Sequence, residues 1–483
     1  MSNVFPYPPR KVQDYPTFLP EQPQPIGSLL DDNEYKQNKN PPKLFHPITI
    51  RGVTFHNRAF VAPMCMYSSD QGRATDHHFV HLGSMALRGW GSIMVEATAV
   101  VPEGRISPED MGLWDDSQIT ELQRIVKYIH ANKGVIGIQI AHAGRKASTP
   151  APWNERLANE KGHSKGSVVP EENGGWPSKV VAPSEISFKA GDYPDPIEAS
   201  IEYLESLKKA YADAVERCSK IGFDFIEIHG AHGYFLHEFI DPISNKRTDK
   251  YGGSLENRLR LPLEIAQLVR EKWDKPLFYR LSATDWLEES LGKEKNAKGE
   301  WAWWYVPISV SSLEEIRNND ELTRELSRGI EQTTIFVGKL AELGVDLVDV
   351  SSGGNDLRQK IAPGPSYQLP FAAHLKKTYP NLLIGSVGII TDAKQANDIL
   401  EQGKADVILI GRQLLRNLDW PLDAAVDLGV AVAPAVQYER AWTRMLVKRE
   451  AHDRTSKEHG ITELQGQEAQ ESKTPPGEHH SIP

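Results

Sequence analysis

Two histidines and a tyrosine lie close together near the middle of the chain. His229, His232 and Tyr234 occur in the segment H-G-A-H-G-Y. An imidazole can bind a metal ion or donate an N–H to an oxygen atom, and a tyrosine hydroxyl can donate a proton. The two histidines could therefore be metal ligands, core residues or hydrogen-bond donors. A metal site needs a third ligand, and the sequence has neither an H-E-x-x-H motif nor a cysteine cluster to supply one.

Glycines and an arginine late in the chain predict a second kind of chemistry. Val387-Gly388 and Gly411-Arg412 each follow a short apolar run. A glycine leaves backbone N–H groups accessible, and an arginine adds a fixed cation, which together suit a phosphate group. The alternative is that the glycines only turn loops, but this leaves the adjacent arginine unexplained. We expect a phosphorylated cofactor or substrate here.

These residues need a scaffold that brings them to one place, and the sequence pattern predicts a (β/α)₈ TIM barrel. Eight short runs rich in β-branched residues predict strands at 59–62, 92–97, 135–141, 223–228, 277–281, 347–351, 382–385 and 407–410. Helical periodicity lies between them, most clearly in the apolar positions Ile201, Leu204, Leu207, Tyr211, Val215, Cys218 and Ile221. No G-x-G-x-x-G follows a strand, so an open dinucleotide-binding sheet is less favoured.

In such a barrel, catalytic residues sit at the carboxyl ends of the strands, and a phosphate commonly binds after strands seven and eight. Gly388 and Gly411 fall at those two positions. The ends of the other predicted strands carry further candidates for the same mouth, namely Pro63 to Tyr67, Ala97, Gln139, His142 to Arg145, His229 to Tyr234 and Arg280.

Composition excludes several classes of function. The 483 residues carry 55 Lys and Arg against 65 Asp and Glu, a net charge of −10, which offers no basic field for nucleic acid. The N-terminus lacks a signal-peptide pattern, and no apolar run is long enough to span a membrane. Two cysteines are too few for a disulfide scaffold. We expect a cytoplasmic protein without nucleic-acid or membrane partners.

The α/β barrel is expected as a single domain with flexible extensions at both ends. Residues 1–42 hold nine prolines, and the polar tail 443–483 has few large apolar side chains, so both are predicted to be mobile or draped over the body. The barrel should span 43–442. Two inserts interrupt it, at 149–180 and at 288–322, the second with the aromatic residues Trp301, Trp303, Trp304 and Tyr305.

Longer motifs resemble one known family. The run R-T-D-K-Y-G-G-S-L-E-N-R at 247–258, together with His229 to Tyr234, is similar to the old yellow enzyme family of FMN-dependent ene-reductases. P-M-C-M-Y at 63–67, H-A-G-R-K at 142–146 and Q-Y-E-R at 437–440 resemble its thermophilic-like subgroup. The resemblance covers about residues 43–442, whereas the two arms and the 288–322 insert depart from the compact members.

The resemblance implies a bound FMN. Its phosphate would lie at Gly388, Gly411 and Arg412, with Val387 as a further cofactor-binding residue. Gln139 and Arg280 would face the pyrimidine edge of the flavin, where they stabilise negative charge on the reduced ring. Ala62, Pro63, Met64 and Ala97 would contact the ring. Cys65 would tune the flavin, the alternative being a small buried thiol. For Arg280 the alternative is an ion pair inside the barrel.

The family further implies that the chain uses NADPH or NADH to reduce the activated C=C bond of an α,β-unsaturated carbonyl compound. His229 and His232 would bind the carbonyl oxygen, Tyr234 would protonate the α-carbon, and Tyr67 would line the substrate pocket. Near-terminal Arg440 would reach into a neighbouring subunit's site, which implies a homodimer or a higher oligomer. Two other functions stay open at this point, a flavin-free barrel lyase or metal hydrolase using the histidine pair, and a flavin-binding protein without turnover.

Overall fold

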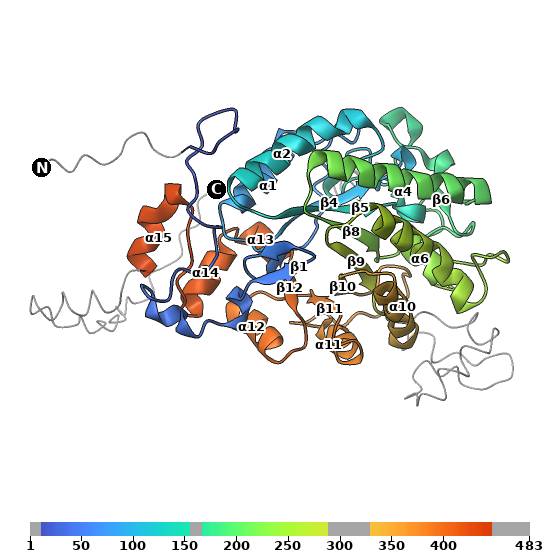
Figure 1. The fold of residues 1–483 in the computed structure, drawn as a ribbon. Coiled ribbons are helices and arrows are strands. Elements are labelled where there is room, and N and C mark those ends of the chain that lie inside the picture. The colour runs from blue at the N-terminus through green and yellow to red at the C-terminus, as the bar shows by residue number, and fades with distance from the viewer. Residues whose placement is uncertain (1–10, 155–166, 288–328, 447–483) are drawn as a thin grey trace, which may run out of the picture.

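The computed structural model describes residues 11–154, 167–287 and 329–446. Eight parallel strands form one sheet in the order β3-β12-β11-β10-β9-β8-β5-β4, and a parallel bridge between Phe60 and Ser92 joins its two edges. The strands thus close into the predicted barrel, with helices around the outside (Figure 1). The barrel strands are β3 (Ala59–Val61), β4 (Ile93–Ala99), β5 (Ile136–Ala141), β8 (Phe225–Gly230), β9 (Leu277–Ser282), β10 (Leu347–Ser351), β11 (Leu383–Ser386) and β12 (Val407–Ile410).

Each predicted strand is present, but several end later than the apolar pattern indicated. β4 continues to Ala99 and β8 to Gly230. His229 therefore lies within a strand rather than after it, whereas Ala97 and Arg280 lie within strands as predicted. In the ladder His229 pairs with Arg280 and Gly230 with Leu281, so the backbone keeps its strand hydrogen bonds where the side chains are no longer apolar.

The outer helices present one apolar face to the barrel. They are α1 (Asp76–Ala86), α2 (Ile119–Ala131), α4 (Ile201–Ile221), α6 (Leu255–Lys272), α10 (Ile330–Glu342), α11 (Leu369–Thr378) and α12 (Ala393–Glu401). In α4 the hydroxyl of Ser200 accepts the N–H of Tyr203, and Gly222 ends the helix with φ 96°. The predicted stripe is buried from Leu204 onward, including Cys218, whereas Ile201 in the first turn is exposed.

A hairpin closes the amino-terminal end of the barrel. Its strands β1 (Ile48–Ile50) and β2 (Val53–Phe55) precede β3, and the Phe55 ring lies 5.7 Å from Phe225 and 6.2 Å from Phe278. These aromatic rings fill the barrel interior at that end. The open end, where the strands terminate, is left for the site. The short elements there and outside the barrel are α5 (Phe235–Ile240), α13 (Arg412–Arg416), α14 (Trp420–Asp427), α15 (Glu439–Leu446), β6 (Val181–Ala182) and β7 (Ile197–Glu198).

The described part of the proline-rich N-terminal stretch is draped over the body. Gly27 and Leu30 donate backbone N–H groups to Ala433 and Ala431, and the Asn38 side chain both donates to and accepts from Ala431. These contacts join the two ends of the barrel sequence. Residues 1–10 and 447–483 lie outside the described part, as does the predicted insert 288–322.

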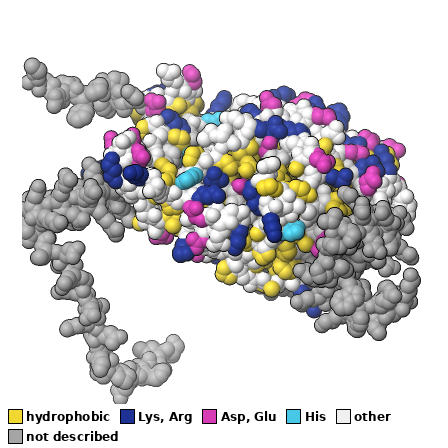
Figure 2. Space-filling model, turned by 60° about the horizontal axis from the view of Figure 1, so that its bottom comes forward, with side chains coloured by type: hydrophobic (Ala, Val, Ile, Leu, Met, Phe, Trp, Pro, Cys, Tyr) yellow, Lys and Arg dark blue, Asp and Glu magenta, His cyan; other side chains and the backbone are white. Residues whose placement is uncertain are grey.

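On the face shown in Figure 2, basic and acidic side chains are interspersed. No helix among the described residues is long and apolar enough to span a membrane.

Candidate active site

A cleft of about 370 Å³ opens at the carboxyl ends of the strands, where the sequence predicts the cofactor. One side is formed by Ala62, Pro63 and Met64 after β3, and the other by the loops after β11 and β12. The residues predicted to bind FMN that line it are Ala62, Pro63, Met64, Arg280, Val387, Gly388, Gly411 and Arg412. Backbone, apolar surface and guanidinium groups therefore meet in one space, as a phosphorylated aromatic ligand requires.

Glycine is needed at position 388 for two reasons. Its φ is +123°, which L side chains rarely adopt, and a Cβ there would lie 2.9 Å from Nε2 of Gln368 and 3.1 Å from the Tyr367 ring. The Gln368 amide donates to Val387 O at 3.0 Å and its oxygen accepts from Ser352 Oγ at 2.6 Å. The loop after β10 thus fixes the loop after β11 at the edge of the cleft.

Inside the barrel mouth, Gln139 and Arg280 are held by two buried acids. Gln139 Nε2 donates to Glu227 Oε1 at 2.7 Å, and Arg280 Nε lies 3.0 Å from Asp349 Oδ2. Burial, and then the charge of Asp349, raises the pKa of Glu227 to about 8. Arg280 therefore has the interior ion pair that was the alternative interpretation, and its side chain also lines the cleft. The two roles are compatible.

Cys65 and Tyr67 stand next to this cleft in the segment after β3. The thiol of Cys65 pairs with the backbone of Ala97, and burial raises the pKa of Cys65, so the thiol stays protonated. Tyr67 has a left-handed backbone with φ 47°, and its ring meets Trp153 edge to face at 5.6 Å. Burial raises the pKa of Tyr67 as well. Both side chains are neutral groups at neutral pH.

His229, His232 and Tyr234 form one cluster. The ring centroid of His229 lies 5.3 Å from that of His232 and 5.0 Å from that of Tyr234. Burial, and then the charge of Arg280, lowers the pKa of both histidines well below the ordinary value. Neutral imidazoles carry one N–H each. The N–H of Ala231 faces Nδ1 of His229 at 3.4 Å, so His229 carries its proton on Nε2.

His232 has a partner that restricts its role. Its Nε2 lies 2.7 Å from Ser351 Oγ. Ser351 Oγ also lies 3.3 Å from Gln368 Oε1, so its single proton serves one of the two contacts. When Ser351 donates to the closer His232 Nε2, the proton of His232 is on Nδ1, which can then serve a ligand. Lys146 holds the backbone here by donating to the carbonyls of His232, at 2.8 Å, and of Gly354.

Tyr234 lines a small pocket with Ala97, Asp110 and His229. Burial raises the pKa of Tyr234 well above its ordinary value. Its hydroxyl is therefore protonated throughout the neutral pH range. Burial, and then Glu96, raises the pKa of Asp110 to about 7.

Arg440 does not join this site within one chain. It is an exposed residue of α15, a helix that stands at the edge of the molecule (Figure 1). Of the same motif, Gln437 accepts from Gln22 at 3.0 Å, and the Tyr438 ring faces the Arg88 guanidinium at 4.7 Å. A role of Arg440 in a site requires a second copy of the chain.

Several residues at the site were not predicted from the sequence. Gln368 and Tyr367 line the cleft from the loop after β10. Glu227 contacts the predicted residue Gln139, and Asp349 contacts the predicted residue Arg280. Gln368 and Tyr367 could have been predicted as site residues, because they follow a predicted strand on the catalytic face. Glu227 and Asp349 lie within β8 and β10, where the surrounding residues are apolar and a single acid gives no recognisable pattern.

Fold and site together define the class of protein, an α/β-barrel enzyme with a cleft for a phosphorylated aromatic cofactor at the carboxyl ends of its strands. Residues 43–302 match the model of the NADH:flavin oxidoreductase / NADH oxidase family. The chain is 42% identical to an NADH:flavin oxidoreductase from Gibberella zeae over 88% of this chain and 93% of the relative. It is 39% identical to an NADPH dehydrogenase from Geobacillus thermodenitrificans over 83% of this chain and 98% of the relative.

The chain belongs to this family, the old yellow enzymes. Its barrel also matches the solved structure of morphinone reductase with a TM-score of 0.58 and 22% identity, covering 82% of this chain and 91% of that one. The protein is thus an FMN-dependent oxidoreductase that takes hydride from NAD(P)H, which removes the flavin-free lyase or hydrolase from consideration.

The residues present fit FMN. Gly388, Gly411 and Arg412 offer backbone N–H groups and a guanidinium to the phosphate, and Ala62, Met64 and Arg280 line the same cleft, so the phosphate and the ring would each find a suitable surface.

Proposed function

We propose that this enzyme reduces the activated C=C bond of α,β-unsaturated carbonyl compounds. The observation that carries the proposal is the cluster of His229, His232 and Tyr234, two neutral imidazoles and a protonated phenol at the carboxyl end of β8. The cluster adjoins the cofactor cleft through Ser351, which contacts His232, and through Arg280, which pairs with His229 in the strand ladder. When bound, FMN accepts a hydride from NAD(P)H and delivers it to a substrate carbon.

The chain's own residues would prepare the substrate for that delivery. His229 Nε2–H and His232 Nδ1–H would donate to the carbonyl oxygen and withdraw electrons from the conjugated bond. Because both histidines are neutral, each supplies a hydrogen bond without a charge that would need a counterion. Tyr234 would then protonate the α-carbon. Gln139 and Arg280 would stabilise negative charge at the flavin's pyrimidine edge.

The alternative without turnover is a flavin-binding protein. Consumption of NADPH on addition of 2-cyclohexenone, with loss of the enone double bond, supports the reductase. His229→Ala should weaken phenol or enone binding about tenfold or more while FMN stays bound, since a lost hydrogen bond in a buried site costs about 1–3 kcal/mol. An NADPH-reduced flavin that no activated alkene reoxidises would contradict the proposal.

A shared site in a homodimer or higher oligomer is part of the same proposal. The exposed position of Arg440 on peripheral α15 supports it, because this side chain is accessible to a second copy. A cytoplasmic location stays a prediction. The aromatic insert 288–322, which follows the fifth predicted strand, is expected to act as a lid, and it lies outside the described residues.

A further inference from the structure

The turn that carries His232 and Tyr234 has an unfavourable backbone. His232 and the following Gly233 are both left-handed, with φ 60° and 70°. A non-glycine residue in this region costs about 1 kcal/mol or more, so neighbouring contacts must hold it. The turn also presses on the loop after β10, since a Cβ on Gly233 would lie 2.3 Å from Gly354 O. The position of the two functional side chains therefore depends on what fixes this turn.

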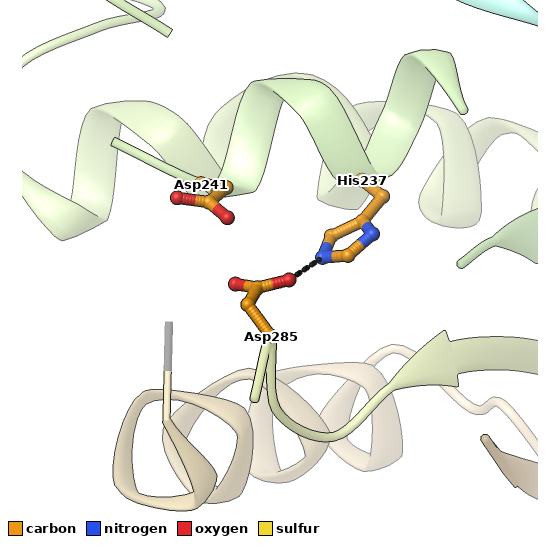
Figure 3. A group of neighbouring side chains, drawn as sticks. All are labelled: His237, Asp241 and Asp285. Carbon is orange, nitrogen blue, oxygen red and sulfur yellow. Dashed lines mark ion pairs between the residues drawn. The ribbon is translucent and has the colours of Figure 1, made fainter. Parts of the chain in front are cut away.

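Three buried ionisable side chains lie directly behind the turn. His237 and Asp241 come from α5 and its carboxyl end, and Asp285 comes from the loop after β9 (Figure 3). Their nitrogen and oxygen atoms lie within 4.8 Å of one another, and none of the three is exposed. By type and spacing they could surround a metal ion.

The partners of these side chains explain the cluster without a metal ion. Gly233 N–H donates to His237 Nδ1 at 2.8 Å, and His237 Nε2 lies 3.1 Å from Asp285 Oδ1. Because Nδ1 accepts a hydrogen bond, the ring proton is on Nε2 and points to Asp285. The cluster is thus connected directly to the backbone of the turn.

The carboxyl groups of Asp241 and Asp285 are buried neighbours, with one oxygen of each within 4.8 Å of the other. A protonated Asp241 can donate to Asp285. Burial, and then Asp285, raises the pKa of Asp241 to about 8, which keeps that proton in place at neutral pH. Asp241 also accepts from Ile243 N–H at 2.9 Å and from Asn355 Nδ2 at 2.7 Å.

Asn355 extends the connection to a third loop. It lies after β10, next to Gly354, and its carbonyl and side-chain oxygens accept from Arg145 at 2.6 and 3.1 Å. The buried chain of hydrogen bonds therefore runs from the turn after β8, through the loop after β9, to the loop after β10. These are the loops that meet at His232.

We propose that His237, Asp241 and Asp285 form a brace that positions the turn bearing His232 and Tyr234 for substrate binding. The brace touches neither substrate nor flavin, so its members are positioning residues. The inference rests on the proposed function, because it assigns the brace to the oxygen-binding histidines.

Two substitutions at position 237 separate the two contacts of the ring. Asparagine places an oxygen near the site of Nδ1 and can still accept from Gly233, whereas glutamine places its amide near Nε2 and keeps only the contact with Asp285. In the FMN-loaded enzyme, we expect H237Q to weaken binding of 4-methoxyphenol at least about tenfold, and H237N, which keeps the Gly233 contact but loses the one with Asp285, to weaken it only about threefold. Both should keep FMN and their rate of reduction by NADPH.

Hydrogen exchange gives a readout that does not depend on the reaction. In H237Q the Gly233 amide loses its acceptor, so the peptide covering 229–236 should exchange at least about tenfold faster, but not in H237N. The matched control is His130→Ala, which breaks a His–Asp pair of 2.9 Å with Asp224 that joins α2 to the residue preceding β8. It should change neither phenol binding nor exchange at 229–236.

A second pair of variants tests the brace if H237Q does not fold. D285N can accept from His237 and donate to Asp241, so it should bind the phenol within about threefold of wild type. In D241N, one of the two accepting oxygens becomes an NH₂ group, which then faces another donor, either Ile243 N–H or the Asn355 amide. This variant should therefore weaken phenol binding at least about tenfold.

Equal phenol affinity in H237N and H237Q, or in D285N and D241N, would overturn the proposal. Equal loss of FMN and of NADPH-dependent reduction in all variants would also overturn it, since it indicates general packing. If wild type itself neither binds the phenol nor reduces an enone, the proposed function is wrong, whereas exchange at Gly233 still reports on the brace.

Discussion

Replacing Tyr234 with phenylalanine tests the assigned proton donor because the change removes one oxygen atom and little else. The ring contacts are retained, with His229 at 5.0 Å and Lys146 Nζ 5.5 Å from the ring centre. The backbone hydrogen bonds of Tyr234 to Ala231 and Glu238 do not involve the side chain. We therefore expect the variant to fold and to bind FMN as wild type does.

The expected loss follows from the state of the hydroxyl. Burial raises the pKa of Tyr234, so in wild type the proton is present across the neutral range and is transferred without prior ionisation. A positioned general acid contributes about 10²- to 10⁴-fold to the rate, which corresponds to about 3–5 kcal/mol of activation free energy. The reduction of the flavin by NADPH needs no proton from Tyr234 and should change less than about threefold.

Stopped-flow measurement of the two half-reactions separates these expectations. Flavin bleaching with NADPH reports the first, and reoxidation by 2-cyclohexenone reports the second. The control is Tyr211→Phe in α4, which also removes a buried hydroxyl, one that has no hydrogen-bond partner among the described residues. It should leave both rates unchanged. An equal loss in both half-reactions of Tyr234→Phe, or no loss in the second, would refute the assignment.

Three further predictions concern the cofactor, the fold and the oligomer. Gly388→Ala should lower FMN content after gel filtration by at least about tenfold because of its φ of +123° and its close neighbours, whereas Gly364→Ala, with open space around it, should not. Burial raises the pKa of Glu238 to about 8, so its neutral form stabilises the fold at low pH and this contribution is lost as pH rises from about 4.5 to 8. Denaturant unfolding at pH 5.5 and 8 should show that the free energy of unfolding of wild type falls by up to about 3 kcal/mol relative to that of Glu238→Gln. An equal change in the free energy of unfolding of both proteins between the two pH values would contradict this prediction. Arg440→Ala should raise the KM for the enone and spare FMN content, and a fully active monomer by light scattering would exclude a shared site.

The barrel could be predicted because its signals are local. Alternating β-branched runs and helical stripes such as that of α4 follow from burial on one face, and they predicted all eight strands of the sheet. The ends of the strands were less predictable. His229 and Gly230 are not typical strand residues, yet they pair with Arg280 and Leu281 because the neighbouring strand offers its hydrogen bonds there.

The candidate site was predictable where a residue's position relative to a strand determined its role. Gly388, Gly411 and Arg412 line the cleft as expected from their place after the last two strands. Gln368 and Asn355 are different, since their partners Val387 and Asp241 come from other loops. Such contacts depend on how the loops pack in three dimensions, and no spacing in the sequence encodes them.

The acids inside the barrel show why the predicted contact residues are held so firmly. Gln139 and Glu227 are directly opposite in the β5–β8 ladder, and Arg280 and Asp349 are opposite in the β9–β10 ladder. Each functional side chain therefore has a partner fixed by strand register rather than by a loop. Asp349 lies 3.0 Å from the Arg280 guanidinium, so the guanidinium can face the cleft without an uncompensated buried charge. The register of the barrel thus sets the electrostatics of the cofactor site.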